Sequence, residues 1–172
     1  MAERELLRHR MIAAGIDVGI GIGLAVAVSI VALVARVLPG VLGDIAGTLV
    51  YGGGVVVVLA YVLGRDVLAG GRSFGKKAQD LSVVTSSGKA ITLEHSVKRN
   101  AIFAAGYSIA TLSFLASLIP FLQALQCLLT GAAGFVSVAA LVAEVAWVLQ
   151  DPEGLRLGDK FAGTRVVWTD EQ

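Results

Sequence analysis

Long stretches without a charged residue most limit what this chain can fold into. No Asp, Glu, Lys or Arg occurs at positions 18–35, 45–64 or 100–143. Runs of 18 or more mostly apolar residues with few or no charges are typical of transmembrane helices. Charged residues make up only 16% of the chain, whereas roughly 25% is usual in soluble domains. The sequence therefore predicts a polytopic all-α membrane protein and excludes both a soluble globular domain and a disordered chain.

The apolar runs predict four transmembrane helices within a single domain, residues 1–172. About 20 helical residues cross the roughly 30 Å of bilayer hydrocarbon, so the run after Asn100 is long enough for two spans. Pro120 marks the turn between them. A cleaved signal peptide is the alternative for the first span, but Asp17 interrupts its apolar region and favours a retained helix. The predicted helices cover about 11–35, 45–64, 101–119 and 128–149, with a loop at 65–99 and a tail at 150–172.

The basic residues determine the expected orientation. All Lys and Arg residues except Arg36 lie before the first predicted helix, in the loop 65–99 or in the tail 150–172. Because Lys and Arg accumulate in cytoplasmic loops, we expect both termini and this loop to be cytoplasmic. With both termini on the same side, the number of membrane crossings must be even, and four helices satisfy this.

The polar segments contain patterns typical of β-strands. Residues 81–84 and 90–93 are apolar-rich runs on either side of a turn at Gly88, which predicts a hairpin. The tail run 164–168 has the same character. We therefore expect a small cytoplasmic β-hairpin, or a three-stranded sheet if the tail strand pairs with it, since three strands are more stable than two.

The segment GRSFGKK at 71–77 superficially resembles a phosphate-binding P-loop. Lys77, however, stands where a magnesium-binding Ser or Thr is needed, and the segment follows a predicted membrane helix rather than a strand. We expect instead a Gly-rich turn whose Arg72, Lys76 and Lys77 face anionic lipid headgroups. Membrane lipid is thus an expected partner, and nucleic acid is not.

Two carboxylates lie inside the predicted spans, Asp17 and Glu144. Each is about 9 Å from the cytoplasmic end of its helix at about 1.5 Å per residue. A charge at such a depth is costly, so we expect both to face the bundle interior and to share protons if they are close. Arg10 precedes Asp17 on the same helix face, and its long side chain can reach toward that carboxylate.

Small and polar residues form stripes along the predicted helices. Gly15, Gly19 and Gly23 repeat every four residues, the spacing that lets membrane helices approach closely, so we assign them to helix packing. Thr130 and Ser137 lie on one face with Glu144. That stripe either packs against a neighbour or lines a polar pathway.

We find neither the ligand spacing of a metal site nor a Ser, His and Asp arrangement typical of hydrolases. The sequence therefore predicts no metal, no cofactor and no enzymatic activity.

Three motifs in this order suggest a family. They are RMIAAGID at 10–17, GRSFGKK at 71–77 and LGDKFAGTRVV at 157–167, with Arg99-Asn100 before the third predicted span. The chain resembles the RDD family of bacterial integral membrane proteins over nearly its whole length. The resemblance implies a multi-pass protein of the bacterial cell (inner) membrane.

The family's name refers to one arginine and two aspartates, and the matching positions are Arg10, Asp17 and Asp159. Gly158 departs from the pattern, because a histidine is common before that aspartate. The family is often described as transport-related and includes a member described as a sodium/proton antiporter. Such a role does not transfer from fold alone.

Two functions therefore stay open. The first is a small proton-coupled transporter or exchanger of sodium or another monovalent cation. In it Asp17 binds the ion, Glu144 shares the proton and Arg10 tunes the site, in a homo-oligomer because the chain is short. The second is a non-transporting membrane scaffold or adaptor, in which Arg10, Asp17 and Asp159 form a structural ion network.

Overall fold

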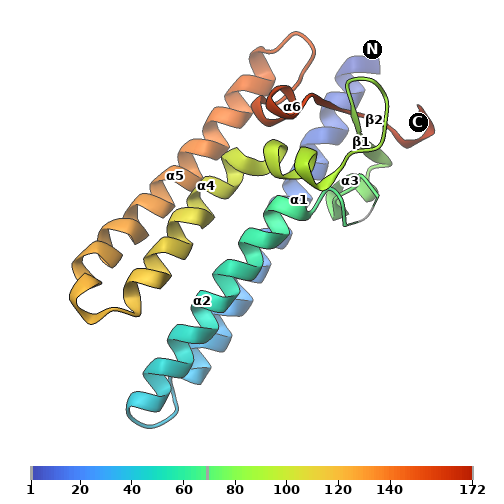
Figure 1. Cartoon of the computed structure of the whole chain (residues 1–172). Coiled ribbons are helices and arrows are strands. Elements are labelled where there is room, and N and C mark those ends of the chain that lie inside the picture. The colour runs from blue at the N-terminus through green and yellow to red at the C-terminus, as the bar shows by residue number, and fades with distance from the viewer. Residues whose placement is uncertain (1, 69, 172) are drawn as a thin grey trace. The chain divides into compact units, whose positions relative to one another are not determined.

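The computed structural model describes residues 2–68 and 70–171. Within them, four helices are long and apolar enough to cross a membrane, which confirms the predicted fold class. Two antiparallel strands and two short helices accompany them (Figure 1). The elements are α1 (Ala2–Ala35), α2 (Val41–Gly64), α3 (Phe74–Lys77), β1 (Leu81–Thr85), α4 (Leu93–Ser117), α5 (Gln123–Gln150), α6 (Leu157–Ala162) and β2 (Thr164–Trp168), with single 3-10 turns at Pro120–Leu122 and Thr169–Glu171.

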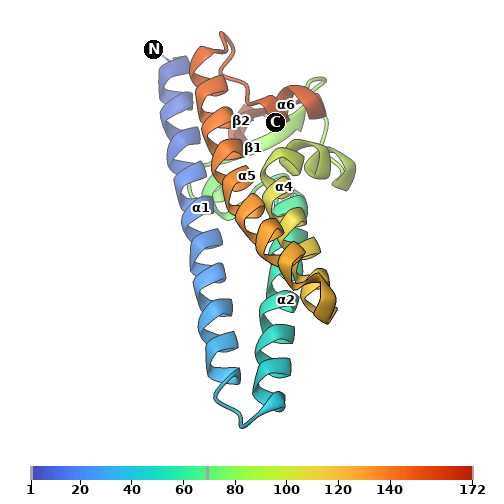
Figure 2. The same ribbon diagram turned by 90° about the vertical axis from the view of Figure 1, so that its left-hand side faces the viewer.

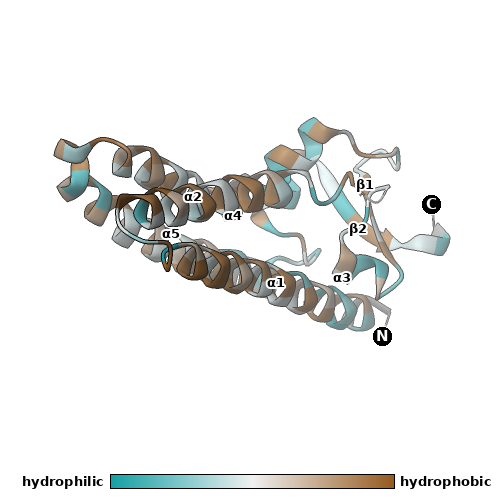
Figure 3. Cartoon of the chain, turned by 90° about the horizontal axis from the view of Figure 1, so that it is seen from below, coloured by the Kyte–Doolittle hydropathy of each residue, from teal (hydrophilic) through white to brown (hydrophobic). Residues whose placement is uncertain are grey.

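The long helices extend beyond their apolar stretches. α1 and α4 both begin in charged sequence, before the first residues expected from hydropathy. Hydropathy marks where a helix enters an apolar layer, whereas backbone hydrogen bonding decides where the helix starts. Figure 3 shows the result, because brown apolar residues dominate most of α1 and teal residues gather toward its N-terminal end.

The two turns between adjacent long helices follow their proline and glycine residues. α1 and α2 are joined by a short turn (Figure 2), in which Gly40 has a φ of 62°. Between α4 and α5, Ile119 is extended and Pro120 opens a single 3-10 turn. Proline is well placed at the first position of a helix, because it lacks only an N–H that would have no partner there.

The sheet contains two strands. β1 pairs antiparallel with β2, with Leu81 opposite Trp168 and Thr85 opposite Thr164, so the expected pairing of the tail strand is confirmed. The expected strand at 90–93 is wrong. Only Ala90 forms an isolated bridge, to Val84, because α4 takes up the chain from Leu93 onward.

The chain divides into two compact units. The polar unit comprises Met1–Ile20, Val62–Ile102 and Leu141–Gln172, and the apolar unit comprises Gly21–Tyr61 and Phe103–Ala140. In the polar unit the sheet packs on the N-terminal half of α1, where Ala13, Leu81 and Val166 form a small buried core.

Glycines bring the helices of the apolar unit close together. A Cβ at Gly54 would overlap Val28 of α1, one at Gly52 would overlap the ring of Phe114 on α4, and one at Gly106 would overlap the hydroxyl of Ser137 on α5. The predicted packing role of Gly15, Gly19 and Gly23 is not borne out within this chain. Nothing described lies within 4 Å of a Cβ built at any of the three.

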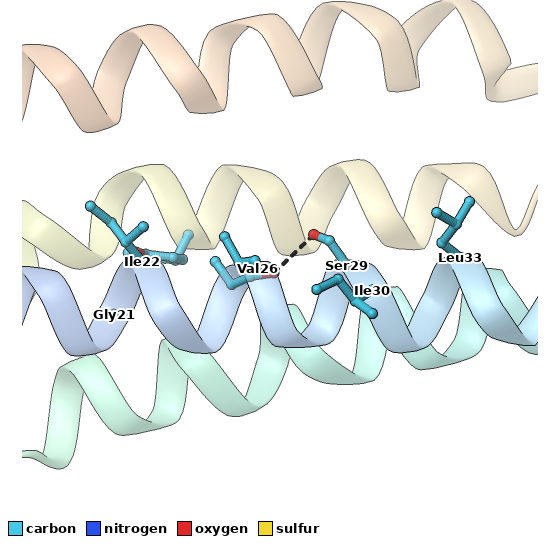
Figure 4. A pocket seen from close by; sticks show the side chains of 8 residues that line it. Gly21, Ile22, Val26, Ser29, Ile30 and Leu33 are labelled. Carbon is cyan, nitrogen blue, oxygen red and sulfur yellow. Dashed lines mark hydrogen bonds between the residues drawn. The ribbon is translucent and has the colours of Figure 1, made fainter.

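A shallow apolar groove runs along α1 in the apolar unit (Figure 4). Its volume is about 390 Å³, and Ile22, Val26 and Tyr107 contribute to its lining. Ser29 also lines it, but its hydroxyl donates to the carbonyl of Ala25 at 2.8 Å. The lining of the groove is therefore mostly apolar.

Candidate functional site

The N-terminal turn of α3 encloses Asp17. This carboxylate is 5% exposed. The hydroxyl of Ser73 donates to its Oδ2 at 2.5 Å and the backbone N–H of Gly75 donates to its Oδ1 at 2.8 Å. Ser73 is also the N-cap of α3. The expected approach of Arg10 to Asp17 is wrong, since Arg10 pairs elsewhere.

Gly75 permits this arrangement. A Cβ at Gly75 would overlap the carbonyl oxygen of Ala13 on α1, and it would also meet Asp17 at 3.0 Å. A glycine is therefore required where the α3 backbone meets α1. The motif GRSFGKK thus docks against the first helix.

Asp159 forms ion pairs with arginines from three parts of the chain. Its carboxylate is fully buried and lies 2.9 Å from Arg10 of α1, 2.9 Å from Arg99 of α4 and 3.5 Å from Arg156, which precedes α6. Burial alone raises the pKa of Asp159, but the charges of the three arginines outweigh it and the pKa lies below its usual value. Asp159 therefore holds α1, α4 and α6 together as a charged group.

A second buried carboxylate, Asp66, follows α2. Its Oδ1 lies 2.5 Å from the ammonium group of Lys76, while its Oδ2 lies 3.6 Å from Arg99 Nε and accepts from the Asn100 side chain at 3.0 Å. Burial opposes the charge, but the neighbouring cations lower the pKa of Asp66 well below its usual range. Because Arg99 touches both Asp66 and Asp159, the two clusters form one network.

Lys76 belongs to this network and not to the lipid-facing surface. It is 7% exposed, and its ammonium group also donates to the Ser73 hydroxyl at 3.2 Å. The prediction that Lys76 faces headgroups is therefore wrong. Burial lowers the pKa of Lys76 to about 7, against the opposing effect of Asp66. Lys77 is exposed and Arg72 is half-buried.

Glu144 lies beside the arginine cluster of Asp159. The side chain is 2% exposed, and its Oε1 accepts from the backbone N–H of Gly158 at 3.1 Å. Among the described residues its Oε2 has no hydrogen-bond partner. A Cβ at Gly158 would overlap the carbonyl oxygen of Arg99, so glycine at this position lets the α6 backbone reach both α4 and Glu144.

Asp17 and Glu144 do not pair directly. Within residues 2–68 and 70–171, no hydrogen bond or ion pair joins the two carboxylates, and each has its own backbone donor. A series of polar contacts instead connects Asp17 to the arginine cluster, through Ser73, Lys76, Asp66 and Arg99 and then to Asp159.

Thr130 and Ser137 take part in helix packing. Thr130 lies 2.7 Å from the hydroxyl of Ser113 across the α4–α5 contact, and Ser137 donates to the carbonyl of Ala133 at 2.8 Å. Both lie in the apolar unit. Of the two roles left open for this stripe, these contacts favour packing over the lining of a pathway.

Sequence reasoning missed several members of the network. The sequence pattern gives Arg99 a role only in the basic loop and the family resemblance, assigns Ser73 to a turn and does not single out Asp66. Asp66 lies two residues after the end of α2, and Arg99 lies in the second turn of α4. Their closeness to long apolar segments gives a signal, because charged residues there can turn inward. No group of three His, Cys, Asp or Glu residues suited to a metal occurs in the described part of the chain.

Comparison with known proteins gives one match. The model of the RDD family matches residues 5–163, which is nearly the whole chain. No curated protein and no solved structure matches this chain.

Proposed function

This chain belongs to the RDD family, and from that premise we propose that it exchanges protons for sodium or another monovalent cation across a membrane. It is a multi-pass membrane protein with four apolar helices. The proposal assigns the ion chemistry to the buried carboxylates of the polar unit. It requires a carboxylate that can change its charge at a site away from bulk water.

Glu144 is the observation that carries this proposal. A buried carboxylate oxygen without a hydrogen-bond donor is costly as an anion, because the interior does not replace its lost hydration. Binding a proton or a small cation at Oε2 relieves that cost. Asp159 and Asp66 differ from Glu144, because each forms direct ion pairs with cationic side chains, whereas the donor to Glu144 is the backbone of Gly158.

Asp17 is the second carboxylate in the proposed mechanism. Its two oxygens accept from Ser73 and Gly75, so it has a defined place in the network but no cationic side chain as a direct partner in these contacts. Arg10 acts at Asp159, so any influence of Arg10 on the two membrane carboxylates is exerted at a distance.

Flux in proteoliposomes tests the proposal. Sodium-driven proton movement is measured with a trapped pH dye for the wild type, Glu144→Gln and the matched control Glu94→Gln. Glu94 also lies on a long helix, but it is exposed and pairs with Lys98 one helical turn later. We expect Glu144→Gln to lower the flux at least tenfold and the control to retain it. Equal flux in all three proteins removes Glu144 from the mechanism.

We further propose a setting for this activity. Both termini and the segment between α2 and α4 lie in the cytoplasm of a bacterium, because basic residues accumulate in those segments. The protein acts in the inner membrane as a homo-oligomer, since one chain of four helices offers little room for an ion path. Gly15, Gly19 and Gly23, which have no neighbour within the described chain, suit a contact with another copy.

The ion network itself favours a second candidate, a non-transporting scaffold or adaptor. Asp159 joins α1, α4 and α6 through arginines, which a structural role explains without ion movement. The exposed Lys77 would then help recruit lipid or a partner protein. Absence of sodium- or potassium-driven flux in the wild type, combined with loss of thermal stability in Asp17→Asn, supports this candidate over exchange.

A further inference from the structure

We propose that Lys76, Ser73 and Asp17 form a proton relay, in which Lys76 binds the proton and the Ser73 hydroxyl passes it to the Asp17 carboxylate. The physiological use of the relay rests on the proposed exchange function. Its protonation chemistry is a property of these three side chains and can be measured without any transport.

The three side chains have the donors and acceptors that a relay needs. The ammonium group of Lys76 donates to Ser73 Oγ at 3.2 Å, and Ser73 Oγ donates to Asp17 Oδ2 at 2.5 Å. A hydroxyl can donate one hydrogen bond while it accepts another. Both steps lie within hydrogen-bond reach, the first requirement for proton transfer between positioned groups.

The surrounding structure holds the hydroxyl in place. Ser73 is 1% exposed, and as the N-cap of α3 it also accepts from the backbone N–H of Lys76 at 3.5 Å. The adjacent N–H of Gly75 fixes the other oxygen of Asp17. The relay is therefore fixed to α1 at one end and to α3 at the other.

The charges around Lys76 explain why it is the member that loses a proton. Asp66 acts on it with negative charge, and Asp17 is linked to it through Ser73. Arg99, Arg65 and Arg156 act on it with positive charge. Across the network there are six cations and five anions, which are Lys76, Arg10, Arg65, Arg99, Arg156 and Lys160 against Asp17, Asp66, Asp151, Asp159 and Glu144.

One positive charge is therefore in excess inside a buried cluster. Arginine does not give up its proton in proteins, so Lys76 is the buried cation that can become neutral. Burial lowers the pKa of Lys76 to about 7, which agrees with this assignment.

The transfer step is balanced. An N–H bond of the Lys76 ammonium breaks as its proton moves to Ser73 Oγ, and the original Ser73 O–H proton moves to Asp17 Oδ2. The products are a neutral amine and a carboxylic acid, with the serine hydroxyl restored. Release of the proton from Asp17 and uptake of another by the amine restore the starting state.

Lysine titration tests the first half of the proposal. The full chain is labelled with 13Cε-lysine in lipid nanodiscs, and Lys76→Arg identifies the Lys76 signal. We expect this signal to titrate near pH 7, about three pH units below the other lysines, and to remain unchanged in the control Lys77→Arg. A Lys76 signal that stays in its ammonium form up to pH 9.5 overturns the proposal.

A double-mutant cycle tests the second half. The Lys76 midpoint is measured in the wild type, Asp17→Asn, Ser73→Ala and the double variant. We expect Asp17→Asn to lower the midpoint by at least one pH unit when Ser73 is present and by less than half of that when it is absent. An equal shift in both backgrounds means that Ser73 does not link the two groups, and it overturns the relay.

Flux measurements separate this relay from the proposed exchange. If Lys76 titrates and couples to Asp17 as expected but the wild type carries no flux, the relay stands and the exchange function fails. If the wild type does carry flux, Ser73→Ala is expected to slow it at least tenfold. Unchanged flux in that variant overturns the relay.

Discussion

At the scale of single residues, Asp159 has the greatest structural role. It is fully buried, and two arginine side chains from distant parts of the sequence lie 2.9 Å from its oxygens. Taking such charges out of water is costly, so the pairs hold only while every member has its partner. Removing the carboxylate leaves Arg10 and Arg99 buried with an unbalanced charge.

We expect Asp159→Asn to destabilise the folded protein by about 3–5 kcal/mol, the usual cost of breaking a buried ion pair by removing one partner. Thermal unfolding in detergent, followed by circular dichroism, measures the effect. Asp170→Asn serves as the control, since Asp170 is exposed near the end of the same tail. Equal unfolding temperatures for the two variants contradict a structural role for Asp159.

At the scale of elements, the short helix α3 shows how tertiary contacts stabilise a segment with little intrinsic structure. Four residues are too few for an isolated helix in water. Ser73 caps its first turn, and Gly75 lets its backbone meet α1. Lys76 then reaches Asp66 beyond the end of α2. α3 therefore depends on contacts with α1 and with the segment after α2.

The glycines of α2 allow a test of helix packing with adjacent residues. A Cβ at Gly52 would overlap the ring of Phe114, whereas one at Gly53 meets nothing within 4 Å. We expect Gly52→Ala to destabilise the protein by about 1–3 kcal/mol through overpacking. Gly53→Ala should be neutral or slightly stabilising, because alanine favours the helix by about 1 kcal/mol.

Thermal unfolding of both alanine variants in the same detergent tests whether Gly52 lies at a close helix contact. The order of the two unfolding temperatures is the informative result, since both substitutions add the same methyl group to the same helix. A higher unfolding temperature for Gly52→Ala than for Gly53→Ala contradicts the contact between α2 and α4.

At the scale of the whole molecule, polar and apolar contacts are separated between two units. The polar unit contains the ion network and the sheet, and the apolar unit depends on close helix contacts at Gly52, Gly54 and Gly106. Acid should therefore act mainly on the polar unit, whose folded state keeps Asp66 and Asp159 charged.

The pKa values of Asp66 and Asp159 are lower in the folded chain than the ordinary value of 3.8. Below about pH 4 the unfolded chain therefore binds protons that the folded chain does not, and stability must fall as the pH falls. We expect a steep loss of the free energy of unfolding below pH 4 in detergent. The Asp66→Asn variant should lose less free energy of unfolding over the same pH interval. An identical pH dependence in the wild type and the variant contradicts the assignment of acid sensitivity to Asp66.

The sequence alone determined the membrane class of this protein. Charge-free runs longer than a bilayer crossing leave few alternatives to transmembrane helices, and four such helices are present. The β-rich composition of 164–168 also predicted a strand there but left its pairing open, and the family motifs placed Arg10 and Asp159 among the important residues. Their direct pairing at 2.9 Å agrees with the ion network considered for a scaffold.

Only the tertiary structure decided which charges meet. Helix periodicity placed Arg10 and Asp17 on one face, yet they bind different partners, because α3 and α6 approach that face from segments far apart in the sequence. Whether Lys76 faces lipid or Asp66 depends in the same way on how the loop folds back. Hydropathy records the local cost of leaving water, whereas the pairing of buried charges depends on which backbones approach closely, and here Gly75 and Gly158 permit that approach.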